Sequence, residues 1–404
     1  MKIIVASFTF YPERNGVAIA AEIMVRNLAA AGHQVCVVTG MCGASICDDE
    51  SCEFKIHRFG MVNSSICDPV DKEAYVHLLK NAQPDLIVFH CWGAWPLEQA
   101  LKHFREIGGR KVLLSHGYDT HTIYWHNKFP WGLYSWLKRL PRILALPSNL
   151  SALDRMVVLS AKKDKKRFFD SWVANKLCYK NVSVIPNGIE TTGWNLIPAD
   201  FRERRGLSSG MFFLCVANYF EGKNQEMTIR AFCRANIAGS TLVLIGSQLG
   251  CYGNMVRDLW SIMEPAHPQL KVRFFENLDR QDVISAVLSC DITISASKGE
   301  TQPLTILESM ASGKPFISTD VGCVTEFEGG LIVNNIEEMA GAMRELAGNP
   351  AERGELGRRG KECFDGSYAA EVTNRAWLDL IHQIVGSGNA VQVLASVAEE
   401  NTLS

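Results

Sequence analysis

Short apolar runs alternate with amphipathic stretches along most of this chain. Lys2–Ser7 forms the first run, a loop with proline and glycine follows, and apolar residues then recur at helical spacing from Val17 to Ala31. Further runs of this kind cover 34–40, 54–60, 85–90, 111–117, 155–160 and 182–188. Strands that alternate with helices predict a parallel sheet, and because most runs are apolar throughout, we expect strands buried on both faces.

A second series of strands and helices follows a break in the pattern. After Asn187-Gly188 a polar stretch with glycine and proline reaches Gly210, and we interpret it as a linker. Apolar runs then resume at 212–218, 241–247, 270–277, 291–297, 314–320 and 330–333. Two such series predict an α/β protein with two Rossmann-like, doubly wound parallel-sheet domains that face a cleft, with ligands at the carboxyl ends of the strands.

The same pattern sets the expected domain boundaries. We place the two domains at residues 1–190 and 191–367. An amphipathic stretch at 368–385 predicts a C-terminal helix that crosses back to the first domain, and the tail at 386–404 is small and polar enough to be mobile. Asp279 is a predicted N-cap for the helix that follows it.

Composition narrows the classes of protein that fit. A chain of 404 residues suits two domains, and 47% hydrophobic with 21% charged residues is typical of a globular fold. A formal net charge of −2 excludes recruitment of nucleic acid or of an anionic membrane by overall charge. We therefore expect no nucleic-acid partner, and any basic surface must be local.

Cysteine usage and hydropathy indicate the compartment. The thirteen cysteines include no C-x-x-C pair and none stands at zinc-ligand spacing, and we recognise no signal sequence. Both features favour reduced thiols over a disulfide framework. No run approaches the roughly 20 apolar residues that a membrane span needs. We expect a cytoplasmic protein, which leaves peripheral contact with the inner leaflet of the cell membrane open.

The segment Gly299–Glu308 carries the strongest chemical signal. An apolar strand ends just before it, and Pro303 stands where the first position of a helix is expected. Glu300 would lie in the loop above the helix N-terminus, where free amides and the helix dipole attract an anion, and Glu308 would lie inside the helix. One carboxylate could then accept hydrogen bonds from sugar hydroxyls and the other from a ribose diol. The alternative is a solvated loop charge and a surface helix residue.

This segment resembles the nucleotide-sugar signature of the retaining GT-B glycosyltransferases of family four. Its Glu-x7-Glu pair runs on into ESMASGKPFISTDVG. Further similarities stand in the family's order and span about residues 1–385. They are the amino-terminal glycine loop and helix in YPERNGVAIAAEIMVRNLAAAGHQVCVVTG, the histidine segment LSHGYDT, the stretch VSVIPNGIET and the lysine loop LCVANYFEGKNQ. The resemblance implies an acceptor-binding first domain and a second domain that binds the nucleotide sugar.

The resemblance also implies roles for single residues of the donor site. Glu300 would bind the donor sugar on the face where transfer occurs, and Glu308 would bind the ribose. Lys223 would neutralise the diphosphate as it leaves, and the amides of Leu304 and Thr305 would hold phosphate. Transfer would retain the anomeric configuration, and UDP is the expected carrier ahead of GDP and ADP. For Lys223, a solvated position at a helix start is the alternative.

Three residues of the first domain complete the implied site. Gly16 would let the backbone approach the donor phosphates closely, because a Cβ would obstruct it. His116 would contact the donor sugar near the reacting carbon, and Asp119 would orient either His116 or an acceptor hydroxyl. Simple turn chemistry at Gly16 and a strand cap at His116 are the alternatives.

The phosphate site departs from the family pattern at one position. The family commonly has an arginine five residues before the lysine, and here Asn218 stands there, so one cation is missing. Arg14 or Lys298 could compensate. No Asp-x-Asp motif is placed to hold a metal-bound diphosphate, and the acidic cluster at 48–50 lies in a polar loop that we expect to face solvent. We therefore predict metal-independent transfer and no cofactor beyond the nucleotide-sugar co-substrate.

Three other functions stay open at this point. A nicotinamide dehydrogenase would share the Rossmann architecture, but its G-x-G-x-x-G is missing after the first strand. A sugar-nucleotide epimerase would bind the same donor and transfer nothing to a second substrate. A non-catalytic carbohydrate-binding protein would bind without turnover.

Aromatic and basic residues gather in the first domain and bear on the acceptor. Five of the nine tryptophans lie between Trp92 and Trp136, followed by YSWLKRLPRILALP and by KKDKKR at 162–167. Rings beside cations suit a membrane interface, which predicts a lipid-linked saccharide acceptor in polysaccharide or lipopolysaccharide-type assembly. The alternative is that the aromatics pack the domain and the basic run is solvated. Pro141 and Pro147 are expected to limit any long helix here.

Overall fold

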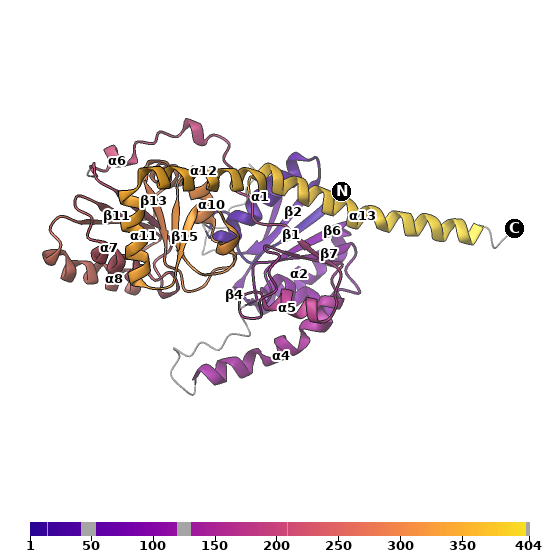
Figure 1. Ribbon diagram of the computed structural model, residues 1–404. Helices are drawn as coiled ribbons and strands as arrows, with labels where there is room; N and C mark the ends of the chain where they lie inside the picture. The colour runs from indigo at the N-terminus through magenta and orange to yellow at the C-terminus, as the bar shows by residue number, and fades with distance from the viewer. Residues whose placement is uncertain (14, 42–53, 119–130, 208, 401–404) are drawn as a thin grey trace. The chain divides into compact units, whose positions relative to one another are not determined.

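A computed structural model describes residues 1–13, 15–41, 54–118, 131–207 and 209–400 (Figure 1). The chain divides into two compact units. Unit 1 comprises Met1–Gly188 and Thr373–Ser404, and unit 2 comprises Ile189–Val372. Each unit contains a parallel sheet, which confirms the predicted α/β class with two Rossmann-like, doubly wound domains.

Unit 1 is built on a seven-stranded sheet whose strand order is β3-β2-β1-β6-β7-β8-β9. Its strands are β1 Lys2–Ala6, β2 Gln34–Gly40, β3 Lys55–Phe59, β6 Leu86–His90, β7 Arg110–Ser115, β8 Arg155–Val158 and β9 Val182–Val184. A separate antiparallel pair, β4 Met61–Asn63 and β5 Ile66–Cys67, was not predicted. Ile3–Ala6 is completely buried, as expected for a central strand covered on both faces.

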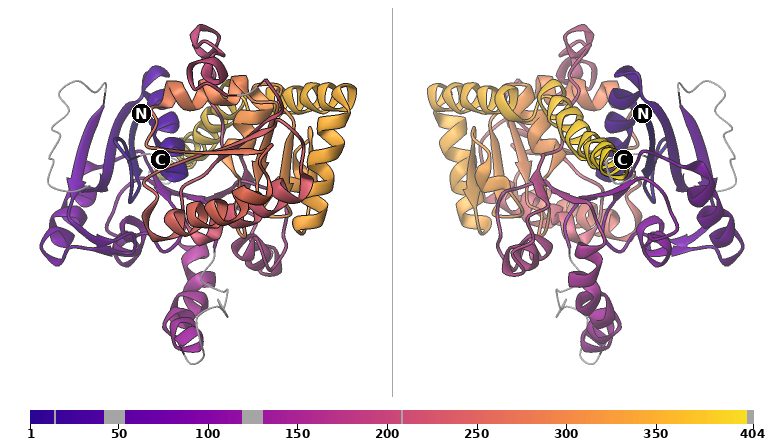
Figure 2. Two further views of the ribbon diagram at one scale, coloured as in Figure 1. Left: turned by 90° about the vertical axis from the view of Figure 1, so that its left-hand side faces the viewer. Right: turned by 90° about the vertical axis from the view of Figure 1, so that its right-hand side faces the viewer.

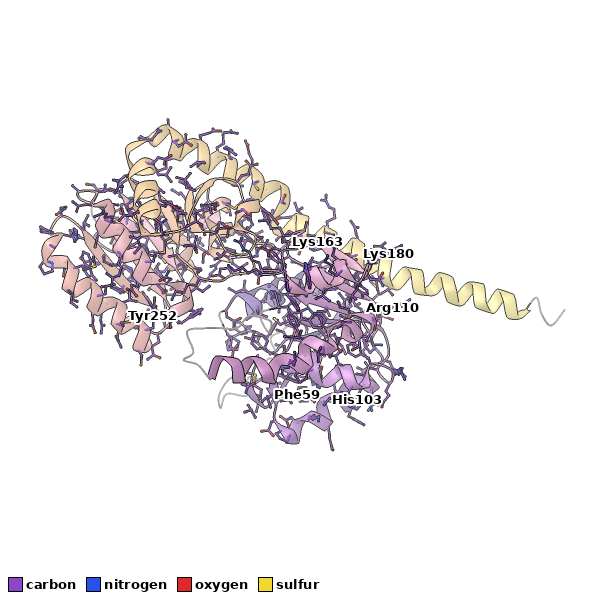
Figure 3. All side chains as sticks on the ribbon, turned by 60° about the horizontal axis from the view of Figure 1, so that its bottom comes forward. Phe59, His103, Arg110, Lys163, Lys180 and Tyr252 are labelled. Atoms are coloured by element: carbon purple, nitrogen blue, oxygen red, sulfur yellow. The ribbon has the colours of Figure 1, made fainter. Side chains whose placement is uncertain are left out.

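Helices cover both faces of the unit 1 sheet. They are α1 Gly16–Ala30, α2 Pro69–Ala82, α3 Trp95–Ala100, α4 Trp131–Ser151, α5 Phe169–Lys176 and α13 Ala370–Glu400. One apolar cluster joins α1 and α13 to the sheet through Val25 and Trp377. On the other face the rings of Phe59 (labelled in Figure 3), Tyr75 and Trp95 meet edge to face.

A carboxylate fixes the register at the amino ends of β7 and β8. Arg110 begins β7 and is labelled in Figure 3, and its guanidinium pairs with Asp154 at 2.8 Å. The Lys111 amide donates to the same carboxylate at 2.7 Å. β7 ends at Ser115, and His116 begins the following loop.

Two helices of unit 1 differ from their predictions. α4 runs unbroken through Pro141 and Pro147, although prolines were expected to limit it. Each proline costs one backbone hydrogen bond, but Leu146 and Leu150 on this helix are buried in an apolar cluster, and that burial offsets the loss. α13 continues to Glu400, beyond the predicted helix end at 385 and through the residues expected to form a tail. Alanine, leucine and glutamine in that stretch favour helix.

Unit 2 is built on a six-stranded sheet whose strand order is β12-β11-β10-β13-β14-β15. Its strands are β10 Phe212–Val216, β11 Thr241–Gly246, β12 Lys271–Glu276, β13 Ile292–Ser295, β14 Phe316–Thr319 and β15 Gly330–Val333. The strand order reverses between β10 and β13. In sheets of this kind ligands bind beyond the carboxyl ends of the strands at such a reversal.

Helices lie on both sides of the unit 2 sheet (Figure 2). They are α6 Phe201–Arg204, α7 Gln225–Ala235, α8 Gly250–Met263, α9 Arg280–Ser289, α10 Leu304–Ala311, α11 Ile336–Gly348 and α12 Pro350–Ser367. α7, α8 and α11 share one apolar cluster with the sheet, and α6 and α9 share another. Asp279 caps α9 as predicted, because its carboxylate accepts from the Asp282 amide at 2.7 Å.

Candidate functional site

The strand reversal of unit 2 brings two predicted site residues together. β10 leads into the short 3-10 helix η3 Glu221–Lys223, and β13 leads into the loop that carries Glu300. The Lys223 ammonium forms an ion pair with Oε1 of Glu300, and the Ser297 hydroxyl donates to the same oxygen at 2.9 Å. The side chains are only 22% and 16% exposed, so the pair is protected from solvent yet reachable by a ligand.

Backbone contacts and a buried glutamine hold these two loops in place. The Lys298 amide donates to the Gly222 carbonyl at 2.8 Å, which ties the loops directly. Gln225, which is buried, donates to the carbonyls of Ala217 and Asn218 at 3.2 and 3.0 Å. The Asn218 residue itself is exposed. These contacts make the position of Lys223 a property of the fold and not of a loose loop.

Lys298 and Arg14 were the two cations proposed to replace the arginine that is missing at position 218. Lys298 is paired at 3.0 Å with Glu221, so its charge is already neutralised on an exposed surface. Arg14 lies outside the described residues. Of the two lysines described in these loops, Lys223 is the one whose ammonium contacts Glu300.

Helix α10 presents its N-terminus at the same strand ends. Pro303 is the N-cap, not the first helical residue as predicted, and it offers no side chain to cap the helix. Leu304 and Thr305 form the start of the first turn, where helix geometry leaves amides without intrahelical acceptors. Both residues are partly exposed, so an anion can reach their amides.

Glu308 lies inside α10 with a partner that the sequence analysis missed. Its side chain is 5% exposed, and Oε1 pairs with the Arg280 guanidinium at 2.5 Å. Arg280 begins α9 and lies over the ring of Trp194 at 6.0 Å from its centroid. Trp194 belongs to η2 Trp194–Leu196, in the stretch interpreted as a linker. A buried carboxylate held from one side by a guanidinium can accept from a diol on the other.

Gly322 supports the loop that carries Glu300. Its φ is +50°, and an added Cβ would lie 2.2 Å from the Thr301 carbonyl oxygen and 2.6 Å from that of Glu300. The Cys323 amide donates to the Thr301 carbonyl at 3.0 Å. Only glycine permits both this backbone conformation and so close an approach.

In unit 1, His116 follows β7 and contacts a second histidine. Its ring stacks on that of His90 with centroids 5.4 Å apart, and Nε2 lies 3.2 Å from Nδ1 of His90. Burial lowers the pKa of His116 to about 4 and that of His90 well below its ordinary value, with the neighbouring His116 adding to the second shift. Burial therefore favours the neutral form of both imidazoles.

A buried carboxylate holds the backbone on either side of His116. Asp170, from the first turn of α5, accepts from the Ser115 hydroxyl at 2.5 Å and from the Trp92 indole at 3.0 Å. The Ser115 hydroxyl oxygen accepts in turn from the Gly117 amide at 3.2 Å. Burial raises the pKa of Asp170, and these hydrogen bonds oppose the rise.

Gly16 and Asp119 are the remaining predicted site residues of unit 1, and only Gly16 lies within the described residues. Gly16 is the exposed first residue of α1, after Asn15, whose side chain caps the helix through the Val17 and Ala18 amides. Asp119 and the acidic cluster at 48–50 lie outside the described residues. Among the residues that are described, no three histidine, cysteine or acidic side chains gather as a metal site would require. Metal independence stays a prediction.

Sequence reasoning missed Arg280, His90 and Asp170 because each acts through a residue distant in the chain. A faint signal existed for His90, the one polar residue that closes the apolar run 85–90. No spacing rule links Asp170 to Ser115 or Arg280 to Glu308.

The described cysteines are all free thiols. Among the helices that the structure describes, we find none with the length and apolar character of a membrane span.

Two family models match the chain, one for each sheet. The model described as glycosyltransferase family 4 matches residues 14–192, and the model described as glycosyl transferases group 1 matches residues 199–363. Together they cover the histidine segment, the lysine loop and the Glu-x7-Glu segment. The chain therefore matches glycosyltransferase models over most of its length. It belongs to the group 1 enzymes of family 4, as the resemblance implied.

Two curated proteins share part of their sequence with this chain. An exopolysaccharide phosphotransferase from Streptomyces coelicolor is 25% identical over 275 residues, 64% of this chain and 26% of that protein. A D-inositol 3-phosphate glycosyltransferase from an Arthrobacter species is 25% identical over 224 residues, 52% of each chain. The matched region thus spans between a quarter and about half of these relatives.

Solved structures confirm the GT-B fold. A sucrose-phosphate synthase from Thermosynechococcus elongatus superposes with a TM-score of 0.76 at 18% identity, over 96% of this chain and 99% of that one. HepE from Anabaena, solved in complex with UDP and glucose, superposes with a TM-score of 0.71 at 15% identity, over 95% of this chain and all of that one. At these identities the likeness establishes architecture alone.

Proposed function

We propose that the chain is a retaining glycosyltransferase that moves a sugar from a UDP-sugar to a saccharide acceptor without a metal ion. The meeting of Lys223 and Glu300 at the strand reversal of unit 2 carries this proposal. One cation and one carboxylate stand together where the carboxyl ends of parallel strands bind ligands. UDP as the carrier is supported by HepE, which was solved with UDP and glucose.

The donor would be divided among four groups of unit 2. The ribose diol would donate to Glu308, and the diphosphate would lie against the α10 amides of Leu304 and Thr305 and against Lys223. Lys223 is paired with Glu300. A bound diphosphate would draw that ammonium toward itself and leave the Glu300 carboxylate free to accept from the sugar hydroxyls.

The reaction would break the bond between the anomeric carbon and the β-phosphate oxygen and form a bond from that carbon to the acceptor oxygen on the same face. The leaving diphosphate would take the proton of the acceptor hydroxyl. Lys223 and the helix amides would stabilise the charge that develops on the leaving oxygen. His116 would contact the donor sugar, and Gly16 would allow the backbone of unit 1 close to the phosphates.

The acceptor is a saccharide in this proposal, and a lipid-linked saccharide stays the prediction from sequence. The name of the Streptomyces relative, which refers to an exopolysaccharide, supports a polysaccharide product. In the described part of α4 Leu144 is 71% exposed, which suits an apolar contact. Arg142 pairs at 3.8 Å with Glu98, so a lipid headgroup would have to compete with this carboxylate for the guanidinium. Asp119 stays a candidate for orienting the acceptor.

Transfer in the presence of excess EDTA tests this function. The purified chain, offered UDP-, GDP- and ADP-sugars with saccharide acceptors, is expected to release UDP and glycosylate an acceptor at the same rate with and without EDTA. Activity that is lost in EDTA and restored by magnesium or manganese would contradict the metal-independent step. Donor conversion that needs no acceptor would favour an epimerase instead, and binding without turnover would favour a carbohydrate-binding protein.

The contact between Arg280 and Glu308 gives a second expected result. Arg280→Met keeps an apolar stem over Trp194 but removes the guanidinium that holds the buried Glu308 carboxylate. We expect the Kd for UDP, measured by calorimetry, to rise about tenfold, which corresponds to about 1.4 kcal/mol.

Arg204→Met is the matched control for this measurement. Arg204 pairs with Asp200 and Asp282, both at 2.7 Å, and is exposed to a degree similar to Arg280, but it has no contact with Glu308. Its substitution is expected to leave the Kd for UDP within about twofold of wild type. An unchanged Kd in Arg280→Met would mean that Glu308 does not bind the ribose in the orientation that Arg280 sets.

A further inference from the structure

His90 lies buried beside His116 and has no role in the donor site described above. It is the last residue of β6, and β6 pairs with β7, which places the two rings at neighbouring strand ends. Its side chain is fully buried, and Nδ1 lies 3.2 Å from Nε2 of His116. A polar ring at this depth requires an explanation, since buried polar groups are normally hydrogen-bonded.

The hydrogen bond between the rings has two possible directions. Two neutral imidazoles in contact share one proton between the facing nitrogens, so one ring donates and the other accepts. The far nitrogen of His90, Nε2, is buried and has no partner within the described residues. If His116 donated, His90 would carry its own proton on this Nε2, and a buried N–H would be left without an acceptor.

The opposite direction avoids the orphaned donor. If His90 donates from Nδ1, its Nε2 carries only a lone pair, and proteins tolerate an unpaired buried acceptor more readily than an unpaired N–H. His116 then accepts at Nε2 and must carry its own proton on Nδ1. We propose that His90 is a positioning residue that holds His116 as a neutral imidazole protonated on Nδ1.

This arrangement determines what His116 can do for the reaction. Its Nε2 lone pair is occupied by His90, so His116 is not a general base through that atom. Its Nδ1–H is a hydrogen-bond donor, which suits an oxygen of the donor sugar. That assignment of the partner rests on the proposed function, whereas the tautomer rests on the contact between the two rings and on the buried Nε2 of His90. Burial, which lowers the pKa of both rings, is consistent with neutral imidazoles.

The backbone near His116 is fixed independently of His90. Ser115 and Gly117 are tied to the buried Asp170 carboxylate through the Ser115 hydroxyl. A change at His90 is therefore expected to alter the proton position and ring orientation of His116 and to leave the surrounding loop in place. This separation makes the role of His90 testable without loss of the fold.

The test is nitrogen NMR of the full chain labelled with 15N-histidine. Wild type is expected to show His116 with a protonated Nδ1 and an unprotonated Nε2, the signals being assigned by their absence in His116→Gln. His90→Phe keeps a ring but cannot donate, and it is expected to shift the His116 proton to Nε2, the form that free histidine prefers. His90→Asn, whose amide can donate from a similar position, is expected to restore the wild-type pattern.

Kinetics of the same variants give a second readout. We expect His90→Phe to lower kcat about tenfold with the donor KM within about twofold, and His90→Asn to recover kcat to within about threefold of wild type. A proton on Nε2 of His116 in wild type, or an unchanged pattern in His90→Phe, would overturn the proposal. If His90→Phe does not fold, the wild-type and His90→Asn spectra decide. If the chain shows the predicted tautomer but no transferase activity, the proposed function is wrong. The inference about His90 would still hold.

Discussion

Glu300→Gln is expected to lower kcat for sugar transfer about 100-fold or more and to leave the Kd for UDP within about threefold of wild type. The Glu300 carboxylate, in contact with Lys223 and Ser297, is assigned to the sugar, whose hydroxyls need a charged acceptor in the transition state. Glutamine keeps the shape of the side chain and removes the charge. Nucleotide binding should survive because Glu308 and the α10 amides are untouched.

Glu221→Gln is the matched control for this variant. Glu221 also pairs with a lysine, Lys298, in the adjoining loops, but its side chain is 72% exposed. Its kcat and Kd are expected to stay within about twofold of wild type. Stopped assays for kcat and calorimetry for UDP separate the two quantities. Wild-type turnover in Glu300→Gln would show that this carboxylate does not bind the reacting sugar.

Gly322→Ala is expected to cost at least tenfold in kcat/KM and to lower the melting temperature. The new Cβ would collide with the Glu300 and Thr301 carbonyl oxygens, so the loop that carries the sugar-binding carboxylate must move. A displacement of this size at a reacting group is expected to lower the rate strongly. The φ of +50° adds backbone strain, which costs an alanine at this position roughly 1–2 kcal/mol.

Gly313→Ala separates the strain from the collision. Gly313 also has a positive φ, +64°, but a Cβ there would meet nothing nearer than the Gly357 carbonyl oxygen at 3.9 Å. We expect a similar strain of about 1 kcal/mol, seen in thermal unfolding, with kcat/KM unchanged. Equal kinetic losses in both variants would mean that general destabilisation, not the position of Glu300, explains the effect.

Much of the fold follows from burial and was predictable from the sequence. Strands such as Ile3–Ala6 are covered on both faces, so their runs are apolar throughout and can be recognised without a partner. The antiparallel pair β4–β5 escaped prediction because its strands are only three and two residues long. The expectation that Pro141 and Pro147 would limit α4 was wrong, because tertiary packing around Leu146 outweighs the low helix propensity of proline.

The candidate site was predictable where chemistry follows a strand end. The pairing of Lys223 with Glu300 arises because β10 and β13 are neighbours and both end at the same edge of the sheet. The supporting residues were not predictable, because their partners are set by lateral packing. Arg280 reaches Glu308 only once α9 and α10 are placed, and Asp170 reaches Ser115 across 55 residues of sequence.

A crystal structure of the chain with UDP bound tests the central claim most directly, that unit 2 holds the nucleotide of the donor at its strand reversal. The account predicts ribose hydroxyls within hydrogen-bond distance of the Glu308 carboxylate, with the diphosphate against the Leu304 and Thr305 amides and the Lys223 ammonium. Lys223 should have exchanged Glu300 for phosphate as its nearest anionic partner. Nucleotide density in another place, or an undisturbed pair of Lys223 and Glu300 with the diphosphate elsewhere, would contradict it.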